Sequence, residues 1–354
     1  MAERRHLLEV NHLVKHFPVT RGALKRVVGQ VHAVDDVSLY VDKGETLGIV
    51  GESGCGKTTL GKCLVRLHAP TSGEMLLQNA SGEQQNLLTL NPKESFETRR
   101  RIQMVFQDPY ASLNPMKNIW TAFDEPLRIH GFGDKEKRLA TASRMMETVN
   151  LQPEYLFRYP HEFSGGQRQR ICIAKALSLN PEIIVCDEPV SALDVSIQAQ
   201  IMNLMRKLQK EFGLTYIFIA HDLSVVEYMS DRIAVMYLGK VVETAPAKLF
   251  STRCRHPYAQ ALISAVPIPK LGAKKEEIVL TGDVPSPIHP PEGCRFHPRC
   301  RYCTERCKKE EPALRPLDGN PDHLVACHLV SGKMSLESSP GPSVSARCGY
   351  TSRL

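Results

Sequence analysis

The chain has 354 residues, of which 42% are hydrophobic and 23% are charged. At roughly 150 residues per domain this predicts two domains, or one large domain with an appendage, and the composition excludes a disordered or fibrous chain. The net charge of +7 is too mild to choose between nucleotides, membrane surfaces and nucleic acid as partners. The longest apolar run covers residues 233–238, whereas a bilayer span needs about 20 residues. Because the charged N-terminus also lacks an apolar signal segment, we expect a folded, cytoplasmic protein.

Residues up to about 245 alternate short β-rich runs with helical patterns, which is typical of an α/β fold with a mostly parallel sheet. Several predicted strands are continuous apolar runs, as in strands buried on both faces; they cover residues 46–50, 102–106, 183–186, 215–220 and 232–237. Apolar residues spaced by three or four predict helices at 134–150 and about 196–212, the second ending at Gly213. The helical stretch from about 110 to 165 interrupts the strands and is predicted to form its own subdomain.

The character of the sequence changes after residue 271. Four prolines between Pro285 and Pro291 indicate a stiff connection, and five cysteines then crowd between Cys294 and Cys327. In a reducing compartment such a cluster favours a metal site over a disulfide framework. Residues from about 332 onward are rich in Ser, Gly and Pro, which predicts a disordered tail.

The segment Gly51–Thr58, GESGCGKT, matches the pattern GxxxxGK[ST] and follows the apolar strand that ends at Val50. Glycines in such a loop let backbone N–H groups face phosphates, and the helix that follows adds the positive end of its dipole. Lys57 is expected to reach the β- and γ-phosphates, and the Thr58 hydroxyl is expected to bind Mg²⁺. The sequence therefore predicts a nucleotide site at this phosphate-binding loop.

Two adjacent carboxylates, Asp187 and Glu188, end the apolar run that begins at Ile183. A carboxylate at the carboxyl end of a parallel strand lies at the crevice where ligands bind. We expect Asp187 to hold Mg²⁺ and Glu188 to polarise an attacking water as general base. Taken alone, such a pair is more often a helix cap or a solvated turn; the phosphate-binding loop upstream favours the catalytic interpretation.

The segment Phe163-Ser-Gly-Gly-Gln167 precedes a helix predicted to run through Ala176. Ser164 is suited to cap that helix, while two glycines expose backbone N–H groups at its start. This arrangement predicts a second anion site, remote in sequence from the first. Two such sites with one nucleotide per chain imply that each completes the other across a dimer.

These motifs in this order, together with Gln107, Ser191-Ala-Leu-Asp194 and His221, resemble the ATP-binding cassette (ABC) ATPases over roughly residues 6–250. The resemblance implies a P-loop NTPase cassette with an inserted helical subdomain. It also implies that Gln107 senses the γ-phosphate and Mg²⁺, that His221 contacts the γ-phosphate, and that Asp194 couples the two sites of a dimer. By itself His221 would also suit an ordinary cap or core position.

The same resemblance implies the remaining nucleotide contacts. Phe17 lies where the family stacks adenine on an aromatic residue, with His16 as the alternative, although Phe17 would also suit plain packing. The implied ATP-binding residues are Phe17, Gly51, Ser53, Gly54, Cys55, Gly56, Lys57, Thr58, Thr59, Gln107, Asp187, Asp194 and, acting on the partner's ATP, Ser164, Gly165, Gly166 and Gln167. The implied Mg²⁺ ligands are Thr58, Gln107 and Asp187, and the implied catalytic residues are Glu188, His221, Gln107 and Lys57.

Residues 255–265, 282–287 and 290–300 resemble the C-terminal extension of dipeptide and oligopeptide importers, which also occurs in ATPases for nickel and glutathione uptake. We place this extension at about residues 251–331. Four cysteines match that family's pattern for a [4Fe-4S] cluster and leave Cys303 as a spare; they are Cys294, Cys300, Cys307 and Cys327. Arginines and lysines around them are expected to offset the cluster's negative charge. Zinc is the alternative, since four thiolates also suit its tetrahedral site, and unligated thiols or a disulfide remain open.

The resemblance implies an ATP-hydrolysing subunit, peripheral at the cytoplasmic face of the cell membrane, that energises import of dipeptides or oligopeptides, or else of nickel or glutathione. The implied partners are a second cassette, usually a different chain, two transmembrane permease subunits and, indirectly, an extracytoplasmic substrate-binding protein; nucleic acid is not expected. ABC ATPases of DNA repair or translation are the alternative class, but the sequence lacks their long coiled coils or tandem cassettes. A binding module without turnover is disfavoured by Glu188 and His221.

Overall fold

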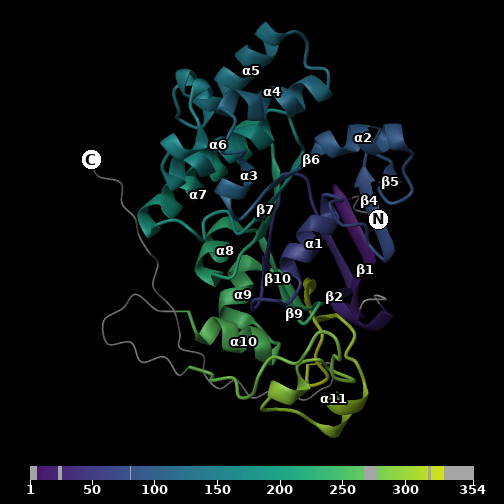
Figure 1. Cartoon of the computed structure of the whole chain (residues 1–354). Helices are drawn as coiled ribbons and strands as arrows, with labels where there is room; N and C mark the ends of the chain where they lie inside the picture. The colour runs from purple at the N-terminus through teal and green to yellow at the C-terminus, as the bar shows by residue number, and fades with distance from the viewer. Residues whose placement is uncertain (1–5, 23–25, 80, 267–276, 318–319, 331–354) are drawn as a thin grey trace.

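The computed structural model describes residues 6–22, 26–79, 81–266, 277–317 and 320–330, and the predicted tail from about residue 332 lies outside them. Two sheets form the framework (Figure 1): an eight-stranded sheet in the order β11-β12-β10-β9-β3-β8-β7-β6 and a four-stranded sheet in the order β2-β1-β4-β5. This arrangement, with helices on the larger sheet, is the predicted α/β fold.

The centre of the larger sheet is parallel and contains all five predicted strands. They are β3 (Thr46–Val50), β6 (Ile102–Val105), β7 (Ile183–Asp187), β8 (Thr215–Ile219) and β9 (Arg232–Tyr237). Four of these, β3, β7, β8 and β9, are buried at every position, which is why the apolar runs are continuous rather than alternating. The carboxyl ends of β3, β6, β7 and β8 point to one edge, because these strands pair in parallel.

Helices connect these strands and cover the sheet. The order along the chain is α1 (Lys57–Leu64), α2 (Pro92–Arg101), α3 (Pro109–Ser112), α4 (Ile119–Ile129), α5 (Lys135–Thr148), α6 (Gly165–Leu177), α7 (Val195–Phe212) and α8 (Leu223–Met229). The two helices predicted from periodicity are confirmed as α5 and α7, and Gly213 ends α7 with φ 64°. Helices α4 and α5 form the upper lobe in Figure 1, above the sheet and joined to it by α6.

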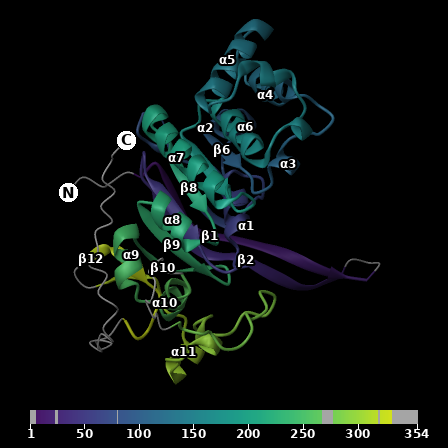
Figure 2. The same cartoon turned by 90° about the vertical axis from the view of Figure 1, so that its left-hand side faces the viewer.

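The four-stranded antiparallel sheet was not predicted. Its strands are β1 (Leu8–Arg21), β2 (Arg26–Val41), β4 (Ser72–Gln78) and β5 (Gln84–Asn86), and the β1–β2 hairpin projects from the body in Figure 2. The pairing of β1 with β2 shifts register four times, so apolar residues do not alternate regularly and the period-2 signal is lost. One core, which includes Val10, Leu60 and Ile219, packs this sheet against the larger one.

The C-terminal part of the chain returns to the larger sheet. After β10 (Lys240–Pro246), α9 (Ala247–Arg253) and α10 (Pro257–Ser264) come α11 (Glu305–Lys309), β11 (Arg315–Leu317) and β12 (Asn320–Val325). Strand β12 pairs antiparallel with β10, and the buried side chains of Glu243 and His323 meet at 2.6 Å between them. Across the described ranges, no helix combines the length and apolar character that a bilayer crossing requires.

Candidate nucleotide-binding and hydrolysis site

The phosphate-binding loop joins β3 to α1. Gly51 and Gly56 take φ values of 153° and 105°, and a Cβ atom at either would collide with a backbone carbonyl, that of Met236 or that of Ala33. Only glycine fits these two positions, because the loop is pressed against neighbouring backbone. The two glycines therefore fix the path that brings Ser53, Gly54 and Cys55 round to the start of α1.

Lys57 is folded back into this loop. Its Nζ donates hydrogen bonds to the carbonyls of Gly51 at 2.7 Å and Glu52 at 3.0 Å, and the residue is 5% exposed. A buried ammonium requires such partners. A bound phosphate would compete with these carbonyls for the same cation, which is the role predicted for Lys57.

Thr58, in the first turn of α1, and Asp187, at the carboxyl end of β7, lie side by side. The Thr58 hydroxyl donates to Asp187 Oδ1 at 2.9 Å. Burial raises the pKa of Asp187, the bond from Thr58 opposes this, and the nearby Glu188 raises the pKa further. A hydroxyl and a carboxylate are oxygen donors that suit Mg²⁺, and a cation here would favour the ionised carboxylate. The residues present therefore fit the predicted ion.

Glu188 lies between two side chains from neighbouring strand ends. Gln107 Nε2 donates to Glu188 Oε2 at 2.9 Å, and His221 Nδ1 lies 3.2 Å from the same oxygen. Glu188 takes φ 47°, a conformation that is uncommon for a residue with a side chain. Its N–H donates to the carbonyl of Ile219 at 2.8 Å, which holds the backbone there. The structure thus brings three of the predicted catalytic residues together.

The FSGGQ segment begins α6 as predicted. Ser164 caps the helix through a capping box with Gln167, with bonds of 3.0 and 3.3 Å. A Cβ at Gly165 would meet Leu193, and one at Gly166 would meet Ile197, so this turn packs against the start of α7. Among the described residues, these contacts of Ser164, Gly165, Gly166 and Gln167 belong to their own helix and to residues 193–197, not to the phosphate-binding loop of the same chain.

Phe17 and Asp194 are two further predicted contacts. Phe17, on β1, packs its ring edge-on to His68 at 5.4 Å and carries Lys15 over its face. Asp194 precedes α7 and makes no side-chain cap. Beside Phe17, the His16 and His32 rings lie 4.0 Å apart.

Asp35, on β2, lies beside both of these histidines. His16 and His32 each approach its carboxylate at 3.3 Å. Although burial raises the pKa of Asp35, the ion pair with Arg295 outweighs it and lowers that pKa to about 2. His16, His32 and Asp35 lie close enough to hold a cation, but Arg295 already supplies one.

The extension brings its cysteines into one neighbourhood. Burial, with a smaller contribution from the nearby thiols of Cys307 and Cys327, raises the pKa of the Cys294 thiol to about 12 and that of Cys300 to about 11. A tetrahedral zinc site with Zn–S of about 2.3 Å needs sulfurs about 3.8 Å apart, and within the described residues these cysteines form no group that tight. Cys303 is half-buried, and its Sγ donates to the carbonyl of Thr304 at 3.6 Å.

Four of the basic residues near the cysteines have carboxylate partners of their own. Arg295 pairs with Asp35 and Arg299 with Glu52, and the remaining pairs are Arg306 with Glu310 and Lys308 with Glu305. That these cations also offset the charge of a cluster stays a prediction. Two of them reach the nucleotide-binding half of the molecule.

The contact between the extension and the phosphate-binding loop was missed by sequence reasoning. Arg299 makes two bonds to the Glu52 carboxylate, at 2.7 and 3.2 Å, and the Glu52 N–H donates to Tyr258 Oη at 2.8 Å. The motifs that hold Tyr258 and Arg299 are visible in the sequence, but the pairing of Arg299 with Glu52 spans 247 positions. No local pattern indicates such a contact.

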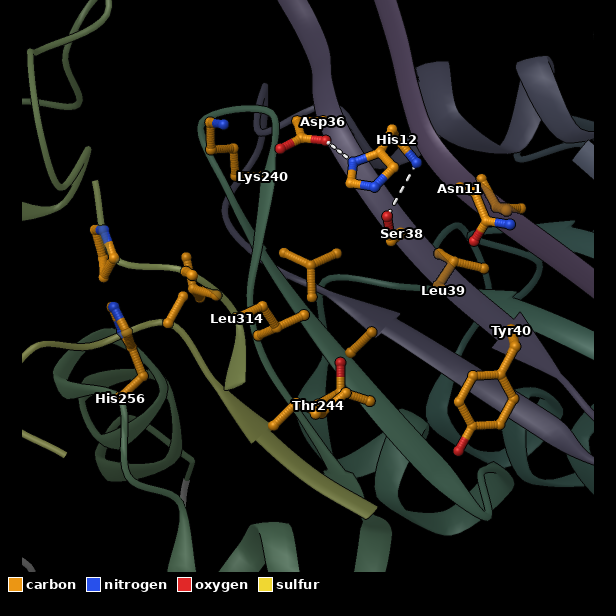
Figure 3. A pocket seen from close by; sticks show the side chains of 18 of the residues that line it. Asn11, His12, Asp36, Ser38, Leu39, Tyr40, Lys240, Thr244, His256 and Leu314 are labelled. Atoms are coloured by element: carbon orange, nitrogen blue, oxygen red, sulfur yellow. Dashed lines mark hydrogen bonds and ion pairs between the residues drawn. The ribbon is translucent and has the colours of Figure 1, made fainter. Parts of the chain in front are cut away.

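A separate cavity of about 490 Å³ lies between β1–β2, the β9–β10 hairpin and residues 311–314 (Figure 3). On one side His12 bonds Asp36 at 2.6 Å and donates from its backbone to Ser38. Leu314 and Thr244 line the opposite side, as Figure 3 shows. None of the predicted nucleotide-binding residues lines this cavity, so it is distinct from the site built around the phosphate-binding loop.

Comparison with known proteins also indicates an ABC ATPase. The ABC transporter family model matches residues 34–191, and the model of the oligopeptide/dipeptide transporter C-terminal region matches residues 242–307. An oligopeptide transport ATP-binding protein, AppF of Bacillus subtilis, is 50% identical over 93% of this chain and 99% of its own length. A probable peptide ABC transporter ATP-binding protein, y4tS of Sinorhizobium fredii, is 47% identical over 94% of this chain and 93% of its own.

Solved structures show the same cassette. A dimeric post-hydrolysis state of the ATP-binding cassette MJ0796, bound to ADP and Pi, matches with a TM-score of 0.58 and 30% identity, over 68% of this chain and 98% of that one. The convergent strand ends, the phosphate-binding loop and the full-length relatives lead to one conclusion. The chain belongs to the ATP-binding subunits of the dipeptide and oligopeptide importer family of ABC transporters.

Proposed function

We propose that this ATPase energises the import of dipeptides or oligopeptides. The observation that carries the proposal is the convergence of Gln107, Glu188 and His221 beside the Thr58–Asp187 pair, because a non-hydrolysing module needs no such set. The peptide cargo is supported by the match of residues 242–307 to the oligopeptide/dipeptide C-terminal region and by the names of the two relatives.

The proposed hydrolytic step assigns each residue a task. Mg²⁺, when bound by Thr58, Gln107 and Asp187, would supply charge neutralisation for the phosphates. Glu188 accepts the proton of the attacking water, and its carboxylate is already oriented by Gln107 and His221. Lys57 leaves the loop carbonyls and pairs with the β- and γ-phosphates. His221, 59% exposed in its side chain, contacts the γ-phosphate from the open side.

The second ATP-binding surface is proposed to belong to a partner cassette. Ser164, Gly165, Gly166 and Gln167 face their own helix and the start of α7 rather than the phosphate-binding loop of this chain. Exposed N–H groups at a helix start bind anions. We infer that they act on ATP held by a second, homologous cassette, with Asp194 coupling the two sites and Phe17 stacking on adenine.

The dimer is proposed to act on two transmembrane permease subunits from the cytoplasmic face of the membrane, with an extracytoplasmic substrate-binding protein delivering the cargo. Closure of two cassettes around ATP would move their helical lobes, here about residues 110–165, and hydrolysis would reset them. The cassette is placed at residues 1–250 and the extension at 251–331.

The extension is proposed to hold a [4Fe-4S] cluster on Cys294, Cys300, Cys307 and Cys327. Cys307 and Cys327 are buried, and Cys294 and Cys300 are half-buried. Burial, to which neighbouring thiols add, raises the pKa values of Cys294, Cys300 and Cys327, so a metal centre would relieve the cost of ionising them together. A four-iron cluster is larger than one ion and needs thiolates farther apart than zinc does. Iron and acid-labile sulfide analysis of protein purified without oxygen tests this; zinc, or no metal, would refute it.

The cargo is tested by uptake of labelled dipeptides, oligopeptides, nickel and glutathione into cells with and without the gene. Loss of peptide uptake alone supports the proposal, and loss of nickel or glutathione uptake alone replaces it. Unchanged uptake of all four, together with a repair or translation defect, would favour the non-transport class.

A further inference from the structure

Residues 294–300, Cys-Arg-Phe-His-Pro-Arg-Cys, are called here the arginine segment. Phe296 at its centre is 2% exposed, and its ring centroid lies 5.2 Å from that of Tyr237 and 5.4 Å from that of Tyr258. A short helical turn, His297–Arg299, follows it. The segment is therefore anchored in the core by an aromatic side chain, which fixes where its two arginines point.

Arg299 points to the phosphate-binding loop. Its guanidinium holds the Glu52 carboxylate in a two-pronged pair, and its side chain is only 8% exposed. Glu52 is fully engaged, because its N–H donates to Tyr258 Oη and its carbonyl accepts from Lys57 Nζ. A partly buried, bidentate arginine–carboxylate pair is strong and geometrically demanding. It fixes the first residue after Gly51, upstream of the amides from Ser53 onward that are expected to face phosphate.

Arg295 reaches the other side of the same loop through a turn. It pairs with Asp35 on β2 and donates to the carbonyl of Leu238 at 2.5 Å. The next residue, Gly239, donates its N–H to the carbonyl of Cys55 in the phosphate-binding loop at 2.9 Å. Arg299 thus holds the loop directly at Glu52. Arg295 holds it indirectly at Cys55, because Gly239, which bonds Cys55, follows the Leu238 that Arg295 bonds.

We propose that the arginine segment positions the phosphate-binding loop for ATP, with Arg299 acting through Glu52 and Arg295 acting through the β9–β10 turn. The loop contains three glycines at positive φ, so ordering it costs more conformational entropy than ordering an ordinary turn. Contacts that order it in advance leave less of this cost to ATP binding. Neither arginine is proposed to touch ATP, so both are positioning residues.

The test is a titration of ATP into the full chain carrying Arg299→Ala, Arg299→Lys or Glu52→Gln, with thermal stability measured on the same samples without nucleotide. Arg299→Ala is expected to raise the Kd and KM for ATP about tenfold, the order expected when a charged hydrogen bond is lost. The kcat at saturating ATP should stay within about twofold, because bound phosphates then order the loop. The Kd of Arg299→Lys should lie between those of the wild type and Arg299→Ala, because lysine keeps the charge but cannot form the bidentate pair.

Two comparisons separate positioning from general stability. The double variant Arg299→Ala/Glu52→Gln should bind ATP no more weakly than Arg299→Ala alone, because both changes break the same pair. Arg301→Ala is the matched control: this exposed arginine lies over the Tyr302 ring at 4.8 Å and should leave the Kd unchanged. Additive losses in the double variant, or a lowered melting temperature with unchanged Kd in Arg299→Ala, would overturn the proposal.

Should Arg299→Ala fail to fold, an ATP titration of Tyr258→Phe tests the proposal instead. Tyr258→Phe keeps the aromatic ring and removes only the oxygen that accepts the Glu52 N–H. Weaker ATP binding by this variant supports the proposal. Unchanged ATP binding by both Tyr258→Phe and Arg299→Lys refutes it. The inference rests on residues 51–58 being the ATP loop. Wild-type protein that binds no ATP would refute that assignment, whereas wild-type binding with unaffected variants refutes the positioning role alone.

Discussion

Gln107 and His221 converge on one atom: Glu188 Oε2 lies 2.9 Å from the amide nitrogen of the first and 3.2 Å from the imidazole Nδ1 of the second. The two residues come from the ends of different strands, β6 and β8, on either side of β7. The other carboxylate oxygen of Glu188 is the one that we propose to face the attacking water. The position of the proposed general base is therefore set by two side chains of the same chain.

Glu188→Gln is expected to lower ATP turnover on the order of 10²-fold or more, because an amide cannot accept the proton of the attacking water. ATP binding should stay within about twofold, since the phosphate-binding loop is unchanged. Steady-state turnover and an ATP titration measure the two effects. Lys57→Ala is the contrasting variant, expected to lose both binding and turnover. Turnover retained by Glu188→Gln would remove Glu188 as the base.

Ser164→Arg is expected to lower ATP turnover on the order of 10²-fold, while the purified subunit still binds ATP. The added side chain blocks the start of α6, which we propose serves the partner's nucleotide, and it leaves the chain's own loop intact. Turnover and ATP-dependent dimer formation are to be measured together. Ser81→Arg, in an exposed turn, controls for the added charge. Full turnover by a protein that stays monomeric, unaffected by Ser164→Arg, would contradict the shared site.

His256 predicts an acid-sensitive fold. It is buried, and burial lowers its pKa to about 3, against about 6.5 in the unfolded chain. As the pH falls below about 6.5 the unfolded chain therefore takes up the proton first, and the free energy of unfolding drops by about 1.4 kcal/mol per pH unit until about pH 3. Protonation also removes the ring nitrogen that accepts the Tyr258 N–H at the start of α10.

His256→Asn provides the comparison, because its side-chain oxygen can cap α10 without titrating in this range. Denaturant unfolding at about pH 6.5 and about pH 5 should show that the wild type loses about 2 kcal/mol more than the variant over this interval. Equal losses in the two proteins would show that His256 is not the group responsible.

Removal of the proposed iron–sulfur cluster is expected to weaken ATP binding. Cys294 and Cys300 end the arginine segment, so loss of the cluster would free both ends of the segment that holds Glu52 and Asp35. Chelation of iron under anaerobic conditions should raise the Kd for ATP severalfold in the wild type and add little in Arg299→Ala. By linkage, bound ATP should slow the loss of iron.

Cys303→Ser is the control for that experiment, because this cysteine is the proposed spare and should leave the iron content unchanged. Cys300→Ser should lower it. A Kd for ATP that does not respond to iron removal in the wild type would separate the cysteine site from the phosphate-binding loop.

The placement of the candidate catalytic residues was largely predictable from sequence, because they belong to contiguous motifs at strand ends. Gly51–Thr58 and Asp187-Glu188 each follow an apolar strand, and parallel pairing brings those ends to one edge. The α6 cap was also predictable, since the capping box of Ser164 and Gln167 is local. The role of Glu52 was not predictable, because its side chain finds its partner only when residues far along the chain fold back onto it.

The four-stranded sheet escaped prediction for a different reason. Long β1 and β2 carry bulges, and His12 and Asp36 sit at φ 50° and 57° within them, so inward and outward positions do not alternate. The large share of polar and half-buried positions on β2 hides the strand further. Its existence depends on packing against the larger sheet rather than on a local signal.

The return of the chain to β10 has a consequence for shortening this protein. Strand β12 satisfies backbone groups of β10 at Glu243 and Thr244, and the new border of the sheet is β11, only three residues long with Pro316 in its middle. Short edge strands that contain proline resist pairing with the strands of other chains. A version cut after α10 would expose β10 as an open template for strand addition, so we expect it to aggregate rather than to yield a free-standing cassette.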